Sequence, residues 1–258
     1  MVLDEKLAAF DREVRQEPVP GPGLRVVREG KLVRLAGRFH FVSFWVLDPT
    51  DARAAVDEIA RRFRARAETV IWRVHGHDKP AGLAAHLATA GFVPDPPGTL
   101  LFLDGDCVHL SSDAGAVQVR RVRTRLELDD FLGAAARAFD SDPGAGLRDV
   151  DAGDLQRPDW QLFVAYIDGL PVASARLEIS RSFGLLYGGG VIPAQRRRGV
   201  YRALVAARVA AALRGGAKTI ATEARETSRP ILERLGFRAA TTETTWVLRN
   251  RSRSGQGS

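Results

Sequence analysis

The first half of the chain alternates between helical and extended hydrophobic patterns. Apolar side chains recur every three or four residues over 3–14, which predicts a short amphipathic helix before a loop rich in Pro and Gly. Runs of Val, Leu and aromatic residues then predict strands, and stretches with a 3.6-residue period predict helices. The expected strands are 24–27, 31–35, 39–47, 70–74 and 99–103, and the expected helices are 49–67 and 80–90.

The second half repeats this order of elements. We expect strands at 117–122, 160–167, 172–179, 183–192, 219–223 and 242–248, and helices at 126–139, 198–213 and 229–235. In each half a strand is followed by Pro, helix, strand, helix, Gly-Phe and strand, with Pro49 and Pro193 as the matching prolines. The repeat favours a duplication over two unrelated halves that share common elements.

These patterns predict a mixed α/β fold of the α+β type with two domains, each a mixed central sheet flanked by helices. The expected domains are residues 1–112 and 113–249, and residues 250–258 have the composition of a disordered tail.

Composition narrows the class of protein. The 258 residues are 45% hydrophobic and 27% charged, as in a packed globular protein. Cys107 is the only cysteine, so no internal disulfide can form and a cytoplasmic location is expected. The start of the chain lacks the pattern of a signal peptide, and no stretch approaches the roughly 20 apolar residues that cross a bilayer. We therefore expect no membrane association.

The net charge of +7 lies entirely in the second half, because residues 1–112 carry equal numbers of acidic and basic side chains. Six arginines account for most of the excess, and without them the net charge is +1. They are Arg196, Arg197, Arg198, Arg249, Arg251 and Arg253. A nucleic-acid partner is therefore not needed to explain the charge, although it stays an alternative.

Residues 191–204 carry the clearest chemistry in the sequence. They predict the end of a strand, a basic turn that ends at Gly199, and the start of a helix. The first N–H groups of a helix lack internal partners and carry the positive end of its dipole, so a diphosphate can accept hydrogen bonds from them. Neighbouring guanidiniums add charge-assisted hydrogen bonds. An arginine-rich helix start on a solvated surface is the alternative interpretation.

This segment resembles the acyl-CoA loop of the GNAT acyltransferase superfamily, which reads Arg or Gln, two variable residues, Gly, one variable residue, then Gly or Ala. Arg196 and Gly199 fit this pattern and Tyr201 departs from it. The resemblance extends over roughly residues 115–249 and includes Pro193 and the Leu-Gly-Phe at 235–237. It implies two GNAT-like domains, of which the first is degenerate, because residues 50–55 contain no glycine.

The resemblance also implies a donor and its binding residues. Acetyl-CoA would be the co-substrate, and Gly189, Gly190 and Val191 would offer backbone groups to its pantetheine arm. A bulge beside a tight packing contact is the alternative reading of these glycines. The rest of the implied donor site is Arg196, Arg197, Arg198, Gly199, Val200, Tyr201, Arg202 and Ser228. For Ser228, an N-cap role is the alternative.

The catalytic residues are marked less clearly. In the family, a primary amine, expected here to be a small molecule, attacks the thioester directly in a ternary complex. A base, often Glu, takes the proton, and a Tyr often protonates the thiolate. Leu232 occupies the position of that Tyr. Glu223 is the first candidate for the base, Glu178 and Tyr187 compete with it, and Tyr201 is a candidate on the acceptor side.

Three further points complete the expectations. The His75-Gly76-His77-Asp78 segment has no third cluster of ligands nearby, so we expect no metal. A non-catalytic acyl-CoA sensor or scaffold is the main alternative to an enzyme. A homodimer and the identity of the acceptor stay open.

Overall fold

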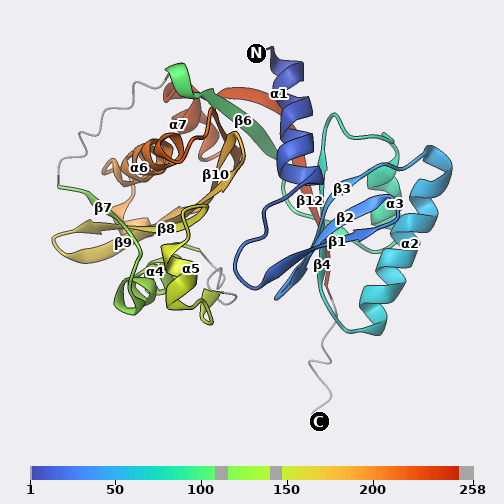
Figure 1. The fold of residues 1–258 in the computed structure, drawn as a ribbon, viewed down its shortest axis with the longest axis horizontal. Coiled ribbons are helices and arrows are strands. Elements are labelled where there is room, and N and C mark those ends of the chain that lie inside the picture. Colours follow the sequence, from blue (N-terminus) through green and yellow to red (C-terminus); the bar gives the residue numbers. More distant parts are fainter. Residues whose placement is uncertain (1, 108–115, 140–146, 250–258) are drawn as a thin grey trace, which may run out of the picture. The chain divides into compact units, whose positions relative to one another are not determined.

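The computed structural model describes residues 2–107, 116–139 and 147–249 (Figure 1). They form two compact units. Residues 250–258, where a tail is expected, lie outside the described residues. Unit 1 comprises Met1–Pro20, Leu24–Thr99 and Thr241–Ser258, and unit 2 comprises Gly21–Gly23 and Leu100–Ala240. Both are mixed sheets with helices, which confirms the predicted fold class. Within the described ranges no helix is long and apolar enough to span a membrane.

Unit 1 has the strand order β1-β2-β3-β4-β12, and β5 also pairs with β12. β3 and β4 are parallel, whereas β1–β2, β2–β3, β4–β12 and β5–β12 are antiparallel pairs. The strands are β1 (Leu24–Glu29), β2 (Leu32–Gly37), β3 (His40–Trp45), β4 (Val70–His75), β5 (Val93–Pro94) and β12 (Arg238–Leu248). The helices are α1 (Leu3–Phe10), the π-helical η1 (Asp11–Gln16), α2 (Pro49–Ala65) and α3 (Leu83–Thr89). α2 starts with Pro at its first position and buries Val56, Ile59 and Phe63 in the core of unit 1.

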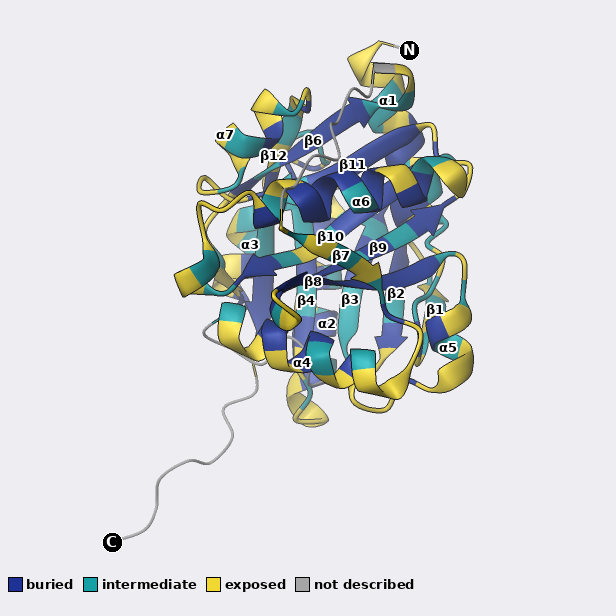
Figure 2. Cartoon of the chain, turned by 90° about the vertical axis from the view of Figure 1, so that its left-hand side faces the viewer, coloured by how far each residue is buried: buried dark blue, intermediate teal, exposed yellow. Residues whose placement is uncertain are grey.

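Unit 2 has the strand order β7-β8-β9-β10-β11-β6. β10 and β11 are parallel, whereas the pairs β7–β8, β8–β9 and β9–β10 are antiparallel. The strands are β6 (Gly98–Asp104), β7 (Gln118–Arg121), β8 (Trp160–Ile167), β9 (Leu170–Ser180), β10 (Phe183–Val191) and β11 (Thr219–Ala224). The helices are η2 (Gly105–Cys107), α4 (Arg125–Ala138), α5 (Ala152–Gln156), η4 (Pro193–Gln195), α6 (Val200–Arg214) and α7 (Arg229–Arg234). The strands are largely buried beneath helices with exposed outer faces (Figure 2).

The last strand of each half lies in the unit built by the other half. Residues 243–248 of β12 pair with β4, from Glu243↔His75 to Leu248↔Val70. β6, which follows the first half's α3 in the chain, lies beside β11 in unit 2 instead. The division into units therefore differs from a boundary at residue 112. Periodicity could not reveal this exchange, because an apolar pattern predicts a strand but does not say which sheet the strand joins.

Several elements differ from the expectation in their extent. α3 begins at Leu83 rather than at residue 80, because the residues between His75 and Leu83 form turns and bends. β12 begins at Arg238, four residues earlier than expected, and β5 was not expected at all. α5 was expected to be loop, but Asp151 caps it by accepting a hydrogen bond from the Asp154 N–H at 2.8 Å.

Candidate active site

β10 and β11 separate in the middle of the sheet of unit 2. Their parallel pairing runs from Phe183↔Thr219 to Leu186↔Thr222 and stops there, although both strands continue. The Thr222 hydroxyl donates to the Leu186 carbonyl oxygen at 2.9 Å and so ties the last pair. Residues 187–191 and 223–224 thus lie beyond the pairing, and we call this region the β10–β11 divergence. Toward β9, β10 stays paired as far as Val191↔Ala173, with a bulge between Tyr187 and Gly190.

The loop between β10 and α6 follows the divergence directly. Arg196 Nε donates to the Val191 carbonyl oxygen at 3.2 Å, which ties the loop to the end of β10. Arg197 and Gly199 have φ values of 62° and 76°, and Gly199 is the N-cap of α6. Glycine adopts this left-handed conformation without the strain of a side chain. The predicted basic turn therefore leads into the N-terminus of a 15-residue helix, where N–H groups lack intrahelical acceptors.

The glycines of the bulge make room for side chains from two helices. A Cβ on Gly189 would lie 3.2 Å from Arg208 and 3.3 Å from the Tyr201 ring, both of α6. A Cβ on Gly190 would lie 2.5 Å from the ring of Phe139, which follows α4. Successive strand residues point to opposite faces, so α6 and the end of α4 pack on opposite sides of β10 (Figure 1). Tight packing thus explains why positions 189 and 190 are glycines. The backbone groups of Gly189 and Gly190 stay candidates for contacts with the donor.

Two of the catalytic candidates occupy matching positions on the diverging strands. Glu223 of β11 and Tyr187 of β10 each follow the last paired residue of their strand. The guanidinium of Arg176 lies 5.3 Å from the centre of the Tyr187 ring, and Arg176 pairs with Glu178 at 3.1 Å. The third candidate, Tyr201, contacts the bulge from α6, as described above.

The start of α7 offers little acid–base chemistry. Leu232, which stands where the family often has Tyr, is 1% exposed. Ser228 is the N-cap residue of α7, but its hydroxyl donates to the Arg225 carbonyl oxygen at 3.2 Å and makes no capping bond. Ser228 therefore occupies the N-cap position, as the alternative interpretation expected, but its side chain does not cap the helix.

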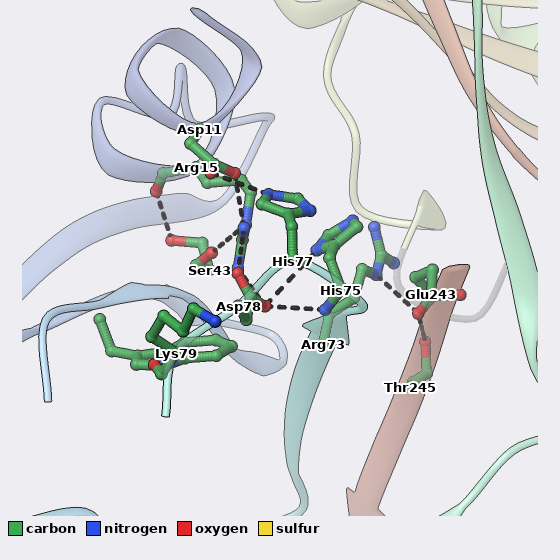
Figure 3. Close-up of polar contacts among 11 residues, drawn as sticks. Asp11, Arg15, Ser43, Arg73, His75, His77, Asp78, Lys79, Glu243 and Thr245 are labelled. Atoms are coloured by element: carbon green, nitrogen blue, oxygen red, sulfur yellow. Dashed lines mark hydrogen bonds and ion pairs between the residues drawn. The ribbon is translucent and has the colours of Figure 1, made fainter. Parts of the chain in front are cut away.

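Unit 1 contains a matching divergence that its own side chains fill (Figure 3). The parallel pairing of β3 and β4 stops at Val42↔Trp72. Beyond it, Arg15 of η1 donates from Nε to the Ser43 carbonyl oxygen at 3.0 Å and from both terminal nitrogens to Asp78 at 2.7 and 2.9 Å. Asp78 in turn accepts the His75 N–H at 2.7 Å. Arg15 and Asp78 thus bridge the two strands where they part.

The start of α2 also differs from that of α6. α2 begins at Pro49, a few residues after the end of β3, and has Asp51 in its first turn. Lys31 pairs with Asp48 and Asp51 at 2.9 and 2.6 Å. Acidic side chains at this helix start would repel a diphosphate rather than bind one.

The polar cluster of unit 1 includes three potential metal ligands, Asp11, His77 and Asp78, with atoms within 4.8 Å of one another. Arg15 lies between the two carboxylates, 2.5 Å from Asp11 and 2.7 Å from Asp78. Burial acts to raise the pKa of Asp11, but the hydrogen bonds and charges of His77 and Arg15 hold that pKa below its ordinary value. The guanidinium of the buried Arg15 thus serves as the cation of this cluster, which is a partly buried ion-pair network.

Arg15→Met is expected to destabilise the protein by about 2–4 kcal/mol, because two partly buried carboxylates lose their cation. Urea unfolding measures the loss, and Lys31→Met, which breaks exposed ion pairs, should cost much less. Folding lowers the pKa of Asp11, so its stabilisation is present above the unfolded pKa and lost as the pH falls through the folded one. The difference between Arg15→Met and the wild type should therefore shrink in acid. Equal losses in both variants at neutral pH would contradict this account.

Comparison with known proteins adds sequence evidence to this geometry. Residues 127–237, which contain the β10–β11 divergence and the start of α6, match the family model of the Acetyltransferase (GNAT) family. The comparison with curated proteins gives no match.

Solved structures resemble the chain over nearly its whole length. A GCN5-related N-acetyltransferase from Kribbella flavida is 19% identical, with 95% of this chain and 93% of that chain covered and a TM-score of 0.69. A tandem GNAT protein from the clavulanic acid biosynthesis pathway is 16% identical, with coverages of 98% and 94% and a TM-score of 0.60. A functionally unknown conserved protein from Staphylococcus epidermidis is 12% identical, with coverages of 90% and 96% and a TM-score of 0.65. At these identities the likeness shows the fold.

Unit 2 thus has a mixed α/β fold in which two parallel strands part beside a glycine-capped helix. Its segment 127–237 matches the GNAT family, and the family resemblance predicted from the sequence is confirmed for this segment. The likeness of the whole chain to a tandem GNAT protein is a likeness of fold.

Proposed function

We propose that the protein is an N-acyltransferase that transfers an acetyl group from acetyl-CoA to a primary amine of a small molecule. The observation that carries the proposal is that the β10–β11 divergence leads directly into the glycine-capped N-terminus of α6, within the segment that matches the GNAT family. A donor whose extended pantetheine arm leads to a diphosphate fits such an arrangement. We also propose a cytoplasmic protein with no nucleic-acid or membrane partner, because the basic excess lies mainly in the loop and the C-terminal residues.

The donor would be held by two kinds of contact. Its diphosphate would accept hydrogen bonds from the first N–H groups of α6, with charge-assisted bonds from the arginines of the loop. Its pantetheine arm would bind backbone groups of Gly189, Gly190 and Val191 in the divergence. The residues assigned to the diphosphate end are Arg196, Arg197, Arg198, Gly199, Val200, Tyr201 and Arg202, and Ser228 is assigned to the α7 side.

The reaction would form a C–N bond between the amine and the thioester carbonyl carbon and break the C–S bond, leaving the electron pair on sulfur. A base must take the proton from the attacking amine, and Glu223 is our candidate because it directly follows the last pair of β11. Leu232 has no proton to donate, so the thiolate would leave without the family's usual acid. Tyr187 stays an alternative candidate for the base, and Tyr201 stays a candidate on the acceptor side.

Unit 1 is assigned a structural role in this proposal. Its divergence is filled by Arg15 and Asp78, and the start of its α2 is acidic. We therefore expect one donor site per chain.

Acetyl-CoA is expected to raise the unfolding free energy of the protein by about 2.7 kcal/mol at 100 times its dissociation constant. A thermal shift assay measures this, and free-thiol release across a panel of primary amines measures the reaction. The absence of any shift at millimolar acetyl-CoA would overturn the donor assignment. A shift without thiol release from any amine would instead favour the acyl-CoA sensor.

A further inference from the structure

Arg208 of α6 is a buried charge in unit 2. It is 1% exposed, and no carboxylate among the described residues pairs with it. Its Nε donates to the Leu204 carbonyl oxygen at 3.0 Å, and one terminal nitrogen donates to the carbonyl oxygens of Arg176 and Tyr187 at 3.3 Å each. Burial lowers the pKa of Arg208 to about 10, while Tyr201 acts in the opposite direction, so the guanidinium is still charged at neutral pH. Burying an arginine without a carboxylate partner costs desolvation free energy, so we expect a specific role for Arg208.

The two carbonyls that Arg208 binds mark the start of the divergence. Tyr187 is the first residue of β10 beyond its last pair with β11, and the bulge of β10 begins there. Arg176 is the register partner of Tyr187 on β9. One nitrogen of Arg208 therefore bridges β9 and β10 at the position where β10 leaves β11.

The bulge is also shaped to receive this guanidinium. A Cβ on Gly189 would lie 3.2 Å from the second terminal nitrogen of Arg208, which is tighter than an ordinary contact. The glycine thus lets the guanidinium lie directly against the backbone of the bulge.

We propose that Arg208 is a positioning residue for the acyl-CoA donor, because it fixes the course of residues 187–191 through the bulge. The inference rests on the proposed function, in which this stretch of backbone binds the pantetheine arm. α6 then sets both ends of the donor path. Its first turn receives the diphosphate, and Arg208, eight residues and about 12 Å further along the helix, holds the bulge.

Arg121 provides a matched control within the same unit. Its guanidinium also donates only to carbonyl oxygens, those of Leu155 at 3.3 Å and Arg157 at 2.6 Å, and burial lowers its pKa as well. It lies on β7, whereas the divergence lies between β10 and β11. Arg121→Met thus removes a comparable set of hydrogen bonds without touching the bulge.

The test compares Arg208→Met and Arg121→Met by calorimetric titration with acetyl-CoA, with thermal unfolding as a measure of stability. Both variants are expected to be less stable than the wild type, but only Arg208→Met should bind acetyl-CoA at least about tenfold more weakly, or 1.4 kcal/mol. Hydrogen exchange in the free protein should be faster over residues 187–191 in Arg208→Met and unchanged there in Arg121→Met. This second measurement does not depend on the donor.

The outcomes separate the two proposals. Wild-type affinity in folded Arg208→Met, or an equal loss in both variants, would overturn the role of Arg208 and leave the donor site in place. A wild-type protein that does not bind acetyl-CoA would overturn the proposed function and this inference with it. If Arg208→Met does not fold, Arg208→Lys carries the test, since it keeps the charge but not the fork of donors. It should bind at least about threefold more weakly, and wild-type affinity would overturn the proposal.

Discussion

Gly199→Glu is expected to abolish acetyl-CoA binding, with a loss of at least about a hundredfold in affinity, while both units stay folded. The new carboxylate would stand at the N-terminus of α6, where the diphosphate is proposed to bind, and would both repel it and compete for the same N–H groups. A Cβ at this position meets nothing within 4 Å, so the side chain has room. The left-handed φ of 76° costs about 1–2 kcal/mol for a residue other than Gly, and a carboxylate at a helix N-terminus offsets part of that cost. The variant should therefore separate binding from folding.

The opposite end of the same helix supplies the control for this experiment. Gly216 follows the C-terminus of α6, has a φ of 90°, and also has nothing within 4 Å of its Cβ position. Gly216→Glu adds the same charge and a similar strain, but away from the proposed diphosphate site. Calorimetric titration should find near wild-type affinity in Gly216→Glu and none in Gly199→Glu. Undiminished affinity in Gly199→Glu would refute the loop as the diphosphate site.

The parts of the molecule that could be predicted from its sequence are those set by local patterns. Apolar periodicity predicted most helices and strands, and the basic turn that ends at Gly199 predicted where α6 begins. A bulge was the alternative interpretation of Gly189 and Gly190, and the structure has a bulge between Tyr187 and Gly190. In each case the signal and the structural feature occupy the same short stretch of chain.

The parts that could not be predicted depend on contacts between distant residues. Arg15 is 28 residues from Ser43 and 63 from Asp78, so nothing near it in the chain shows that it fills a divergence between two strands. In the sequence, Arg208 is only a charged residue that interrupts the apolar pattern of a predicted helix. Its spacing of seven residues from Tyr201, two helical turns along one face, is the signal that could have shown that both side chains meet the same strand. The packing of Phe139 against Gly190 has no such signal.

A fragment of residues 113–258, cut at the boundary expected from the sequence, is expected not to fold. It lacks β6, whose residues 100–103 are at most 3% exposed and lie beside β11. Leu101 and Leu103 belong to the hydrophobic core of unit 2. Four such side chains contribute roughly 6–12 kcal/mol when buried, which is comparable to the whole stability of a typical domain at about 5–15 kcal/mol. The cut also leaves β11 as an unpaired edge, which favours aggregation.

Residues 98–240 make the matching fragment. They contain the strands β6 to β11 of the unit 2 sheet and leave out residues 241–248, of which 243–248 pair with β4 in unit 1. We expect this shorter fragment to be soluble, to unfold cooperatively in urea and to keep a thermal shift with acetyl-CoA, whereas 113–258 does none of these. Cooperative unfolding of 113–258 with a midpoint equal to that of 98–240 would show that β6 is dispensable. The GNAT domain of this chain would then need no strand from the first half, which is the opposite of what the exchanged strands imply.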